Sequence, residues 1–494
     1  MVTRGQTGHC VTGMDKALPV VLGAACARRT RTIPFDAMDI LVTGGDVVTM
    51  NPAREVLLGG AVAVSGNRIA AVGATSALRA RFPGTPELDA RDCVVIPGLV
   101  NAHQHLTGDP LARACIPDDL PPGDSVFGWA VPLHAAHTPD DDELAALVCG
   151  VENLRNGITT VVEAGTVGHP ERVAAAMRTA GIRGTIGTWG WDVPEGPYAA
   201  PADEVLDRLR DVLAKFPKGG TVEGWVTLVG HGLASDELLA CAAGLARSAG
   251  TGMTLHMSPG ESDVDHYLER SGRRPIEHLE DLGVLGPHLL ITHGVWLDDA
   301  EVDAILRSRT AIAYCPWAYL RLGQGASIAG RHAELFGRGG RLALGCDAGN
   351  AGDSADILRA AAAAAGIAKD SAADPTRLGA PEAFELATIH GAEAIGMADR
   401  IGSLEAGKLA DLAILDATGP QWVPRGDIAH QLVWSADGRC VRDVLVDGRI
   451  VVRDHRCVTV DEAELRLTAQ QTSADLLKRA GLTVPHRWPH IPSH

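Results

Sequence analysis

Six titratable side chains stand at the ends of short apolar runs and have the types needed for metal chemistry. They are His103, His105, His231, His256, His293 and Asp347. Alternate residues of a strand point to the same side, so the spacing H-Q-H directs His103 and His105 together. With His256 and Asp347 they would form a set of three imidazoles and one carboxylate. Such a set suits Zn²⁺ or Fe²⁺ and leaves one position open for water.

The apolar runs that end on these residues alternate with Ala- and Leu-rich stretches, a pattern typical of a parallel sheet with crossover helices. Eight strand candidates can be read: VVIPGLVNAHQH, ITTVVEAG, GTIGTW, GWVTLVGH, GMTLH, LLITH, AIAYC and LALGCD. We therefore predict an α/β fold with a (β/α)₈ TIM-like barrel over residues 98–399, in which the βα loops gather these side chains at one face. A doubly wound sheet is the alternative. It is disfavoured because His-rich sequence stands where a Gly-rich phosphate fingerprint would follow the first strand.

The sequence pattern at the two ends of the chain differs from the pattern in the central part. Residues 39–97 and 400–455 consist of short strands separated by turn residues, and we expect them to pair into one small β-sandwich domain. Residues 456–494 are predicted to form a helical tail. Residues 1–38 are predicted to be a disordered N-terminal extension.

Composition limits the classes of partner that the protein can have. The 494 residues carry a formal net charge of −17, which argues against a nucleic-acid footprint or binding to an anionic membrane surface. A small-molecule substrate fits this acidic charge better. No apolar run reaches the ~18 residues of a membrane span. Ten cysteines without a C-x-x-C pair suit reduced thiols, so we expect a cytoplasmic protein. A symmetric homo-oligomer is the usual soluble state.

The motifs PGLVNAHQH, THGVWL, YCPWAYLRLGQG, LALGCD and IGSLEAGKLADLAILD resemble the cytosine deaminase, guanine deaminase and triazine hydrolase branch of the amidohydrolase superfamily. The resemblance extends over residues 39–455. It implies one divalent ion, Zn²⁺ ahead of Fe²⁺, held by His103, His105, His256 and Asp347. It also implies that His293 orients water and polarises the substrate. Asp347 would accept a proton from the water that the ion activates, and pass it to the leaving group.

The sequence departs from this branch after the fifth predicted strand. Related enzymes have H-x-x-E there, with a glutamate that carries protons to a ring nitrogen, but this chain reads His256-Met257-Ser258-Pro259. Glu261 is the nearest acid and is our third catalytic candidate, beside Asp347 and His293. A solvated loop carboxylate is the alternative interpretation of Glu261. This departure makes deamination of a ring less secure than hydrolysis of an amide.

Residues that could bind the substrate also follow predicted strands. Aromatic side chains are scarce in this chain, so their clustering indicates a flat or apolar ligand, although each could equally pack within a loop. These candidates are His231, Trp189, Trp191, Trp317 and Tyr319.

The function predicted from sequence is metal-dependent hydrolysis of a non-peptide C–N bond in a small molecule, such as an amide, a lactam or an amino-heterocycle. The alternative is deamination of an aminated purine, pyrimidine or pterin. Hydrolytic dehalogenation and a non-catalytic binding protein on the same fold are more distant. The binding protein is disfavoured because a scaffold has no need of an open metal site.

Overall fold

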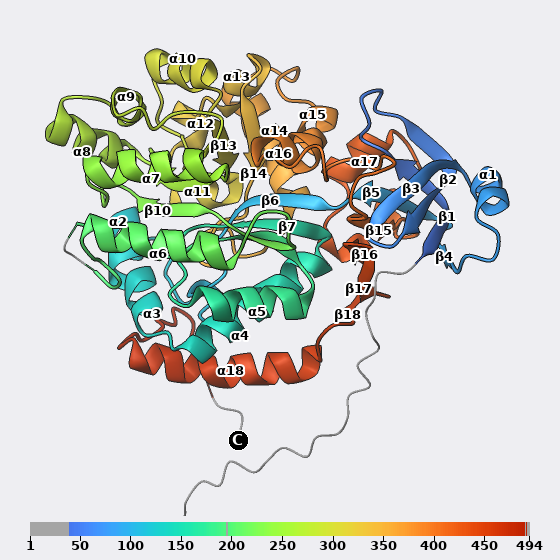
Figure 1. Ribbon diagram of the computed structural model, residues 1–494, viewed down its shortest axis with the longest axis horizontal. Coiled ribbons are helices and arrows are strands. Elements are labelled where there is room, and N and C mark those ends of the chain that lie inside the picture. Colours follow the sequence, from blue (N-terminus) through green and yellow to red (C-terminus); the bar gives the residue numbers. More distant parts are fainter. Residues whose placement is uncertain (1–38, 194–195, 490, 492–494) are drawn as a thin grey trace, which may run out of the picture. The chain divides into compact units, whose positions relative to one another are not determined.

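The computed structural model describes residues 39–193, 196–489 and 491 (Figure 1). The extension expected over residues 1–38 lies outside the described residues. The eight described cysteines are free thiols. Among the described helices, none combines the length and the apolar character that crossing a bilayer requires.

Parallel strands occupy the centre of the chain and fall into two sheets. The first has the order β6-β7-β8-β9 and the second the order β10-β11-β12-β13-β14, and every neighbouring pair is parallel. Almost every residue of these strands is buried, as expected for parallel strands covered on both faces. Their bounds are Leu99–Gln104, Ile158–Glu163, Arg183–Ile186, Val222–Gly224, Val226–Gly230, Met253–Met257, Leu289–His293, Ala311–Tyr314 and Arg341–Leu344.

The run GWVTLVGH, expected as one strand, is divided at Trp225, which separates β9 from β10. β9 pairs with β8, and β10 pairs with β11. The indole of Trp225 is buried beside Gly252, where a Cβ atom would lie 2.4 Å from the ring. At the other edges of the two sheets, a parallel bridge joins Gln104 to Asp347.

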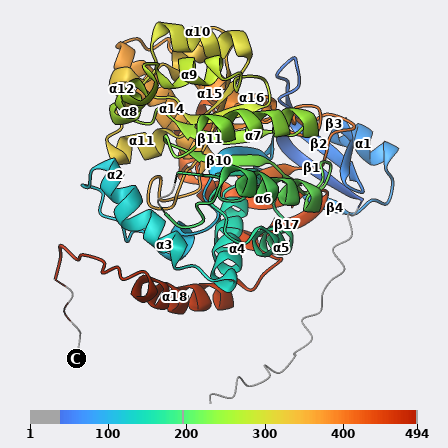
Figure 2. The same ribbon diagram turned by 60° about the vertical axis from the view of Figure 1, so that its left-hand side comes forward.

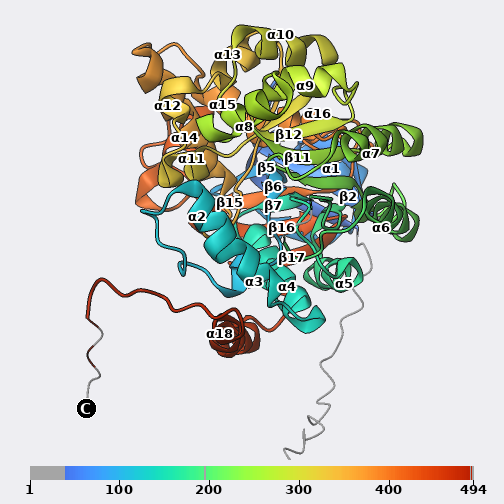
Figure 3. The same cartoon turned by 90° about the vertical axis from the view of Figure 1, so that its left-hand side faces the viewer.

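Helices follow the parallel strands and surround them (Figure 3). The first long helix begins with a capping box, in which Thr138 accepts a hydrogen bond from the Asp141 backbone and the Asp141 carboxylate accepts one from Thr138 N. The main helices are α4 Pro139–Arg155, α5 Pro170–Ala180, α6 Ala202–Lys215, α7 Asp236–Ala249, α8 Glu261–Ser271, α9 Pro275–Asp281, α10 Asp299–Ser308, α11 Pro316–Leu322, α13 His332–Gly337, α14 Ile357–Ala372, α15 Ala380–Ala387 and α16 Ile389–Ala394.

Strands from the two ends of the folded chain pair in one nine-stranded sheet. The connection is the antiparallel pair β5–β15, with Leu412 opposite Pro97 and Asp416 opposite Cys93. The order is β18-β17-β16-β15-β5-β1-β2-β3, and β4 pairs with β1. The strands are β1 Ile40–Val48, β2 Val56–Ser65, β3 Arg68–Ala74, β4 Glu87–Asp89, β5 Cys93–Pro97, β15 Leu412–Asp416, β16 Val441–Val446, β17 Arg449–Arg453 and β18 Arg456–Cys457.

The last helix, α18 (Glu462–Arg479), lies along α4 (Figure 2). Leu476 of α18 is buried in a small apolar cluster with Leu111, Ile116 and Leu133 from the segment between β6 and α4. Arg479 donates a hydrogen bond to Asp141 at the start of α4, with a distance of 2.5 Å. The helix therefore packs against the long connection that follows His105.

A buried ion pair joins the parallel strands to the nine-stranded sheet. Arg183 of β8 donates to Asp411 through Nε at 2.6 Å and to Asp447 through Nη2 at 3.1 Å, and the Arg183 side chain is 2% exposed. Removing one partner of a buried pair leaves an uncompensated charge. We expect Arg183→Met to lower the free energy of unfolding by about 3–5 kcal/mol, measured by denaturant unfolding at neutral pH.

A surface pair provides the control for this substitution. Arg210 bonds Asp207 on α6, and both side chains are more than half exposed. Arg210→Met should cost at most about 1 kcal/mol. Equal losses for the two variants would contradict a structural role for the buried pair.

Candidate functional site

Three histidines converge from β6 and β11. The ring of His103 lies edge-on to His105 and His256, with centroid distances of 5.1 and 4.8 Å. One nitrogen of each ring lies within 4.8 Å of one nitrogen of the other two. His103 and His256 are buried, and His105 is 13% exposed through its side chain. The H-Q-H spacing thus brings the imidazoles of His103, within β6, and His105, directly after it, toward the imidazole of His256 on β11.

The Nδ1 atom of each of these rings has a hydrogen-bond partner. His103 Nδ1 lies 3.0 Å from Thr292 Oγ1, and His105 Nδ1 lies 2.9 Å from Thr166 Oγ1. His256 Nδ1 donates to the carbonyl of Val229 at 2.6 Å. These contacts leave the Nε2 atoms to face one another, the arrangement that outer partners give to metal-bound histidines.

Asp347 completes this cluster from the loop after β14. Its Oδ1 lies 3.4 Å from His105 Nε2 and 3.6 Å from His103 Nε2. Burial alone raises the pKa of the Asp347 carboxyl, but contact with His103 and His105 holds it well below its usual range. Asp347 has a φ of 64°, and its backbone is tied to β6 by Asp347 N→His103 O and by Gln104 Nε2→Asp347 O.

These atoms fit a divalent cation. His105 Nε2 and His256 Nε2 are 3.4 Å apart, and His103 Nε2 is buried without a hydrogen-bond partner among the described residues. Burial and the neighbouring His103 hold the pKa of His256 well below its usual range, so its ring is neutral, as a ligand must be. Imidazole nitrogens and a carboxylate oxygen that face one point form a donor set suited to a divalent cation.

His293 and His231 border this cluster. His293 is the last residue of β12 and His231 directly follows β10, and both have a left-handed backbone, with φ of 83° and 52° respectively. The His293 ring lies 5.5 Å from His256, and its Nδ1 is buried without a partner among the described residues. The His231 ring stacks on His256 at 5.1 Å and its side chain is 26% exposed, so it lies on the open side of the cluster.

A further histidine, His332 of α13, supports His293. Its Nε2 donates to the His293 carbonyl at 2.7 Å, and its ring stacks on Tyr314 with 4.0 Å between centroids. Burial lowers the pKa of His332 to about 4. The ring is therefore neutral at physiological pH and holds a strained strand end in place.

This shift makes stability depend on pH. Below the ordinary pKa of ~6.5 the unfolded chain binds a proton that folded His332 refuses, so stability falls as pH falls toward 4. Between pH 7 and pH 4.5, the titration of His332 should lower the free energy of unfolding by about 2 kcal/mol. His332→Gln keeps an N–H donor but removes the titrating group. Denaturant unfolding at both pH values should therefore show that the variant loses about 2 kcal/mol less unfolding free energy than wild type does. Equal losses in variant and wild type would refute this.

The structure does not bring Glu261 into the cluster. Glu261 is exposed at the start of α8. The buried carboxylate of this segment is instead Asp263, whose Oδ2 accepts from Ser258 N at 2.6 Å and whose Oδ1 lies 3.7 Å from His231 Nδ1. Sequence reasoning passed over Asp263, although helical spacing from an exposed Glu261 would place it on the opposite face.

The aromatic candidates are divided between two places. Trp189, Trp191 and Tyr198 pack together, and the indole of Trp189 lies 5.1 Å from the His134 ring. His134 itself is 6.5 Å from His105, so this group adjoins the histidine cluster. Tyr319 lies 5.6 Å from His293, whereas the Trp317 ring carries the Arg359 guanidinium at 4.9 Å.

Sequence reasoning also missed the groups that hold the cluster in place. Thr166 donates to Glu163, a buried carboxylate that accepts two further backbone N–H groups. Thr292 directly precedes His293 in the run LLITH, and this position next to a site histidine was a signal in the sequence. Only the fold shows that the Thr292 hydroxyl reaches His103. Asn350, in the loop after β14, donates a hydrogen bond from its side-chain amide to the buried Asp109.

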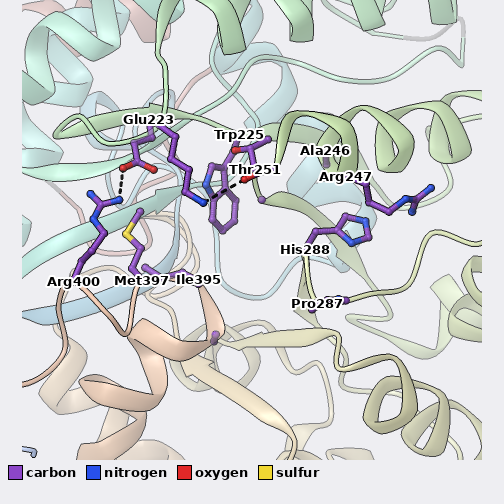
Figure 4. Close-up of a pocket in the computed structure, with 15 residues that line it drawn as sticks. Glu223, Trp225, Ala246, Arg247, Thr251, Pro287, His288, Ile395, Met397 and Arg400 are labelled. Atoms are coloured by element: carbon purple, nitrogen blue, oxygen red, sulfur yellow. Dashed lines mark hydrogen bonds and ion pairs between the residues drawn. The ribbon is translucent and has the colours of Figure 1, made fainter.

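A separate cavity of about 390 Å³ lies at the opposite ends of the strands (Figure 4). Trp225, Gly252 and His288 line it, and these residues precede β10, β11 and β12. An ion pair between Arg400 and Glu223 closes one side. The cavity is distinct from the histidine cluster.

Comparison with known proteins gives a consistent result. The model of the amidohydrolase family matches residues 94–451. A 5-methylthioadenosine/S-adenosylhomocysteine deaminase of Syntrophobacter fumaroxidans is 32% identical over 427 residues, 86% of this chain and 96% of that protein. A zinc-bound adenosine deaminase from Xanthomonas campestris is 28% identical with a TM-score of 0.85, over 89% of this chain and 99% of that one. Atrazine chlorohydrolase from Arthrobacter aurescens TC1, complexed with zinc, shares the fold at 23% identity and a TM-score of 0.81, over 88% and 100%.

Proposed function

Since the chain belongs to the amidohydrolase family, we propose that it is a zinc-dependent deaminase acting on the adenine ring of a small nucleoside. Like its deaminase relatives, it is a hydrolytic enzyme that acts on non-peptide C–N bonds. The nucleoside part of the proposal is supported by the relatives named for adenosine derivatives, one of them 32% identical over most of the chain. The zinc part is supported by the zinc in the adenosine deaminase structure.

One observation carries the proposal: the Nε2 atoms of His103, His105 and His256 and the carboxylate of Asp347 face one point at the strand ends. We assign these four residues as the ligands of one divalent ion. Such an ion lowers the pKa of bound water and supplies a nucleophile at neutral pH.

Asp347 and His293 have distinct parts in this chemistry. The lowered pKa of Asp347 keeps its carboxylate ionised at neutral pH, so it can accept a proton from water and deliver it to the departing amino group. His293 is buried, and burial holds its pKa well below its usual range. Its Nδ1, which has no hydrogen-bond partner in the described part of the chain, is available to hydrogen-bond the atom on which charge develops.

The finer architecture belongs to the same proposal. We propose that the two parallel sheets form one (β/α)₈ barrel, closed where β14 packs on β6 and Gln104 bridges to Asp347. We also propose that the nine-stranded sheet folds over as a sandwich. Separate apolar clusters around β1 and β2 support this, one containing Val42 and the other Leu41.

A second candidate function is hydrolysis of an amide or lactam. It is favoured by Pro259 after His256 and by the exposed position of Glu261, because a ring nitrogen then lacks the expected carboxylate. In an amide the departing nitrogen can take its proton from Asp347 alone.

A substrate panel separates the two candidates. Zinc-loaded enzyme is incubated with adenine nucleosides such as 5′-methylthioadenosine, with lactams and with linear amides, and both ammonia and ring-opened acids are measured. We expect ammonia from the adenine nucleosides at the highest kcat/KM. Turnover of lactams or amides alone would replace the proposal with the second candidate.

A further inference from the structure

One buried carboxylate at the site has no part in the mechanism so far. Asp263 is 8% exposed and stands in the first turn of α8. Its Oδ2 accepts a hydrogen bond from Ser258 N, and its Oδ1 points to His231 Nδ1 at 3.7 Å. A buried carboxylate is costly unless its oxygens are matched by donors, so the second oxygen requires a partner.

His231 is that partner by position. It directly follows β10 with a left-handed backbone, stacks on His256, and keeps a quarter of its side chain exposed. One of its ring nitrogens lies within 4.8 Å of nitrogens of both His256 and His293. The imidazole thus has the carboxylate on one side and the reaction site on the other.

We propose that Asp263 is a positioning residue that holds His231 with its Nδ1–H toward the carboxylate and its Nε2 toward the substrate. The proposal rests on the proposed deaminase function. A separation of 3.7 Å is longer than a hydrogen bond, and such contacts commonly tighten when substrate binds.

The tautomer determines what His231 can recognise. With the proton on Nδ1, Nε2 is a hydrogen-bond acceptor and matches an N–H donor of the substrate, such as the amino group of an adenine ring. A substrate edge that offers only acceptors would face a lone pair. The Asp263–His231 pair therefore selects the amino-bearing edge of the ring.

The substitution Asp263→Asn tests this arrangement. A carboxylate accepts from Ser258 N and from His231 at once, whereas a carboxamide has one acceptor oxygen and cannot serve both. We expect Asp263→Asn to lower kcat/KM for 5′-methylthioadenosine by about 10–100-fold, as for other outer partners of site histidines. Asp263→Ala should behave in the same way. Asp265→Asn, the same change at an exposed position two residues away, is the matched control and should stay within about 2-fold.

A double-mutant cycle separates positioning from a structural role. If Asp263 acts through His231, then Asp263→Asn adds little to the loss already caused by His231→Gln. If Asp263 only braces the turn at Ser258, the two losses multiply and the melting temperature falls equally in both backgrounds. Multiplied losses would overturn the proposal.

The second measurement does not need turnover. In enzyme labelled with ¹⁵N-histidine, the resonances that vanish in His231→Gln belong to His231, and their shifts report which nitrogen carries the proton. We expect the Nδ1–H tautomer in wild type and its loss in Asp263→Asn. An Nε2–H tautomer in wild type, or an unchanged one in Asp263→Asn, would overturn the proposal. If wild type releases no ammonia from adenine nucleosides, the proposed function fails, and this measurement still decides the role of Asp263.

Discussion

Asp347→Asn is expected to abolish most turnover, lowering kcat/KM by about 10²–10⁴-fold, because a carboxamide cannot accept the proton that the ionised carboxylate takes from water. The substitution is a clean one. Asparagine tolerates the left-handed backbone of this position better than most residues, and its oxygen can still face the histidines. Steady-state ammonia release and zinc content should be measured on the same preparation.

Asp353 supplies the control for this prediction. It lies in the same loop, is exposed, and pairs with Arg321 at 2.9 Å. Asp353→Asn should leave kcat/KM within about 2-fold. If Asp347→Asn were as active as this control, another group would have to accept the proton.

Substitution of two neighbouring histidines should separate metal binding from chemistry. We expect His105→Ala to lose both zinc and activity, because His105 Nε2 faces His256 Nε2 and Asp347 Oδ1 at 3.4 Å. His293→Ala should keep zinc and lower kcat/KM by about 10²–10³-fold, the loss typical of removing a group that stabilises developing charge.

Elemental analysis beside activity decides this second prediction. Nitrogen atoms of His231, His256 and His293 also lie within 4.8 Å of one another, so a different ligand set is conceivable on geometry alone. If His293→Ala lost zinc and His105→Ala retained it, the ligands would have to be reassigned to His231, His256 and His293.

The position of the histidine cluster could be predicted from the sequence because it depends on strand periodicity. Alternation placed His103 and His105 on one side of β6, and the parallel arrangement brought the ends of β6, β11 and β14 together. The pairing of the two chain ends was readable for a similar reason. The short strands predicted before residue 97 and after residue 400 need strand partners, and the two groups are joined by the pairing of β5 with β15.

Side-chain contacts between segments far apart in the sequence could not be predicted in this way. The partner of His103 Nδ1 is Thr292, 189 residues later, and no local pattern connects the two. The loop after His256 illustrates a second limit. Glu261 was the catalytic candidate because it is the acid nearest to Pro259 in the sequence. However, α8 begins at Glu261, and successive side chains of a helix are rotated by ~100°. Two residues reverse the face, so Asp263 rather than Glu261 is buried.

Titration of zinc against ammonia release tests the central claim most directly. Metal-free enzyme, prepared with a chelator, is supplied with increasing zinc, and ammonia released from 5′-methylthioadenosine is followed together with conversion of the adenine ring. The four-ligand site predicts activity that rises linearly and levels off at one zinc per chain, with one ammonia for each nucleoside consumed. Undiminished activity without metal, a plateau at two ions per chain, or no ammonia from any adenine nucleoside would contradict it.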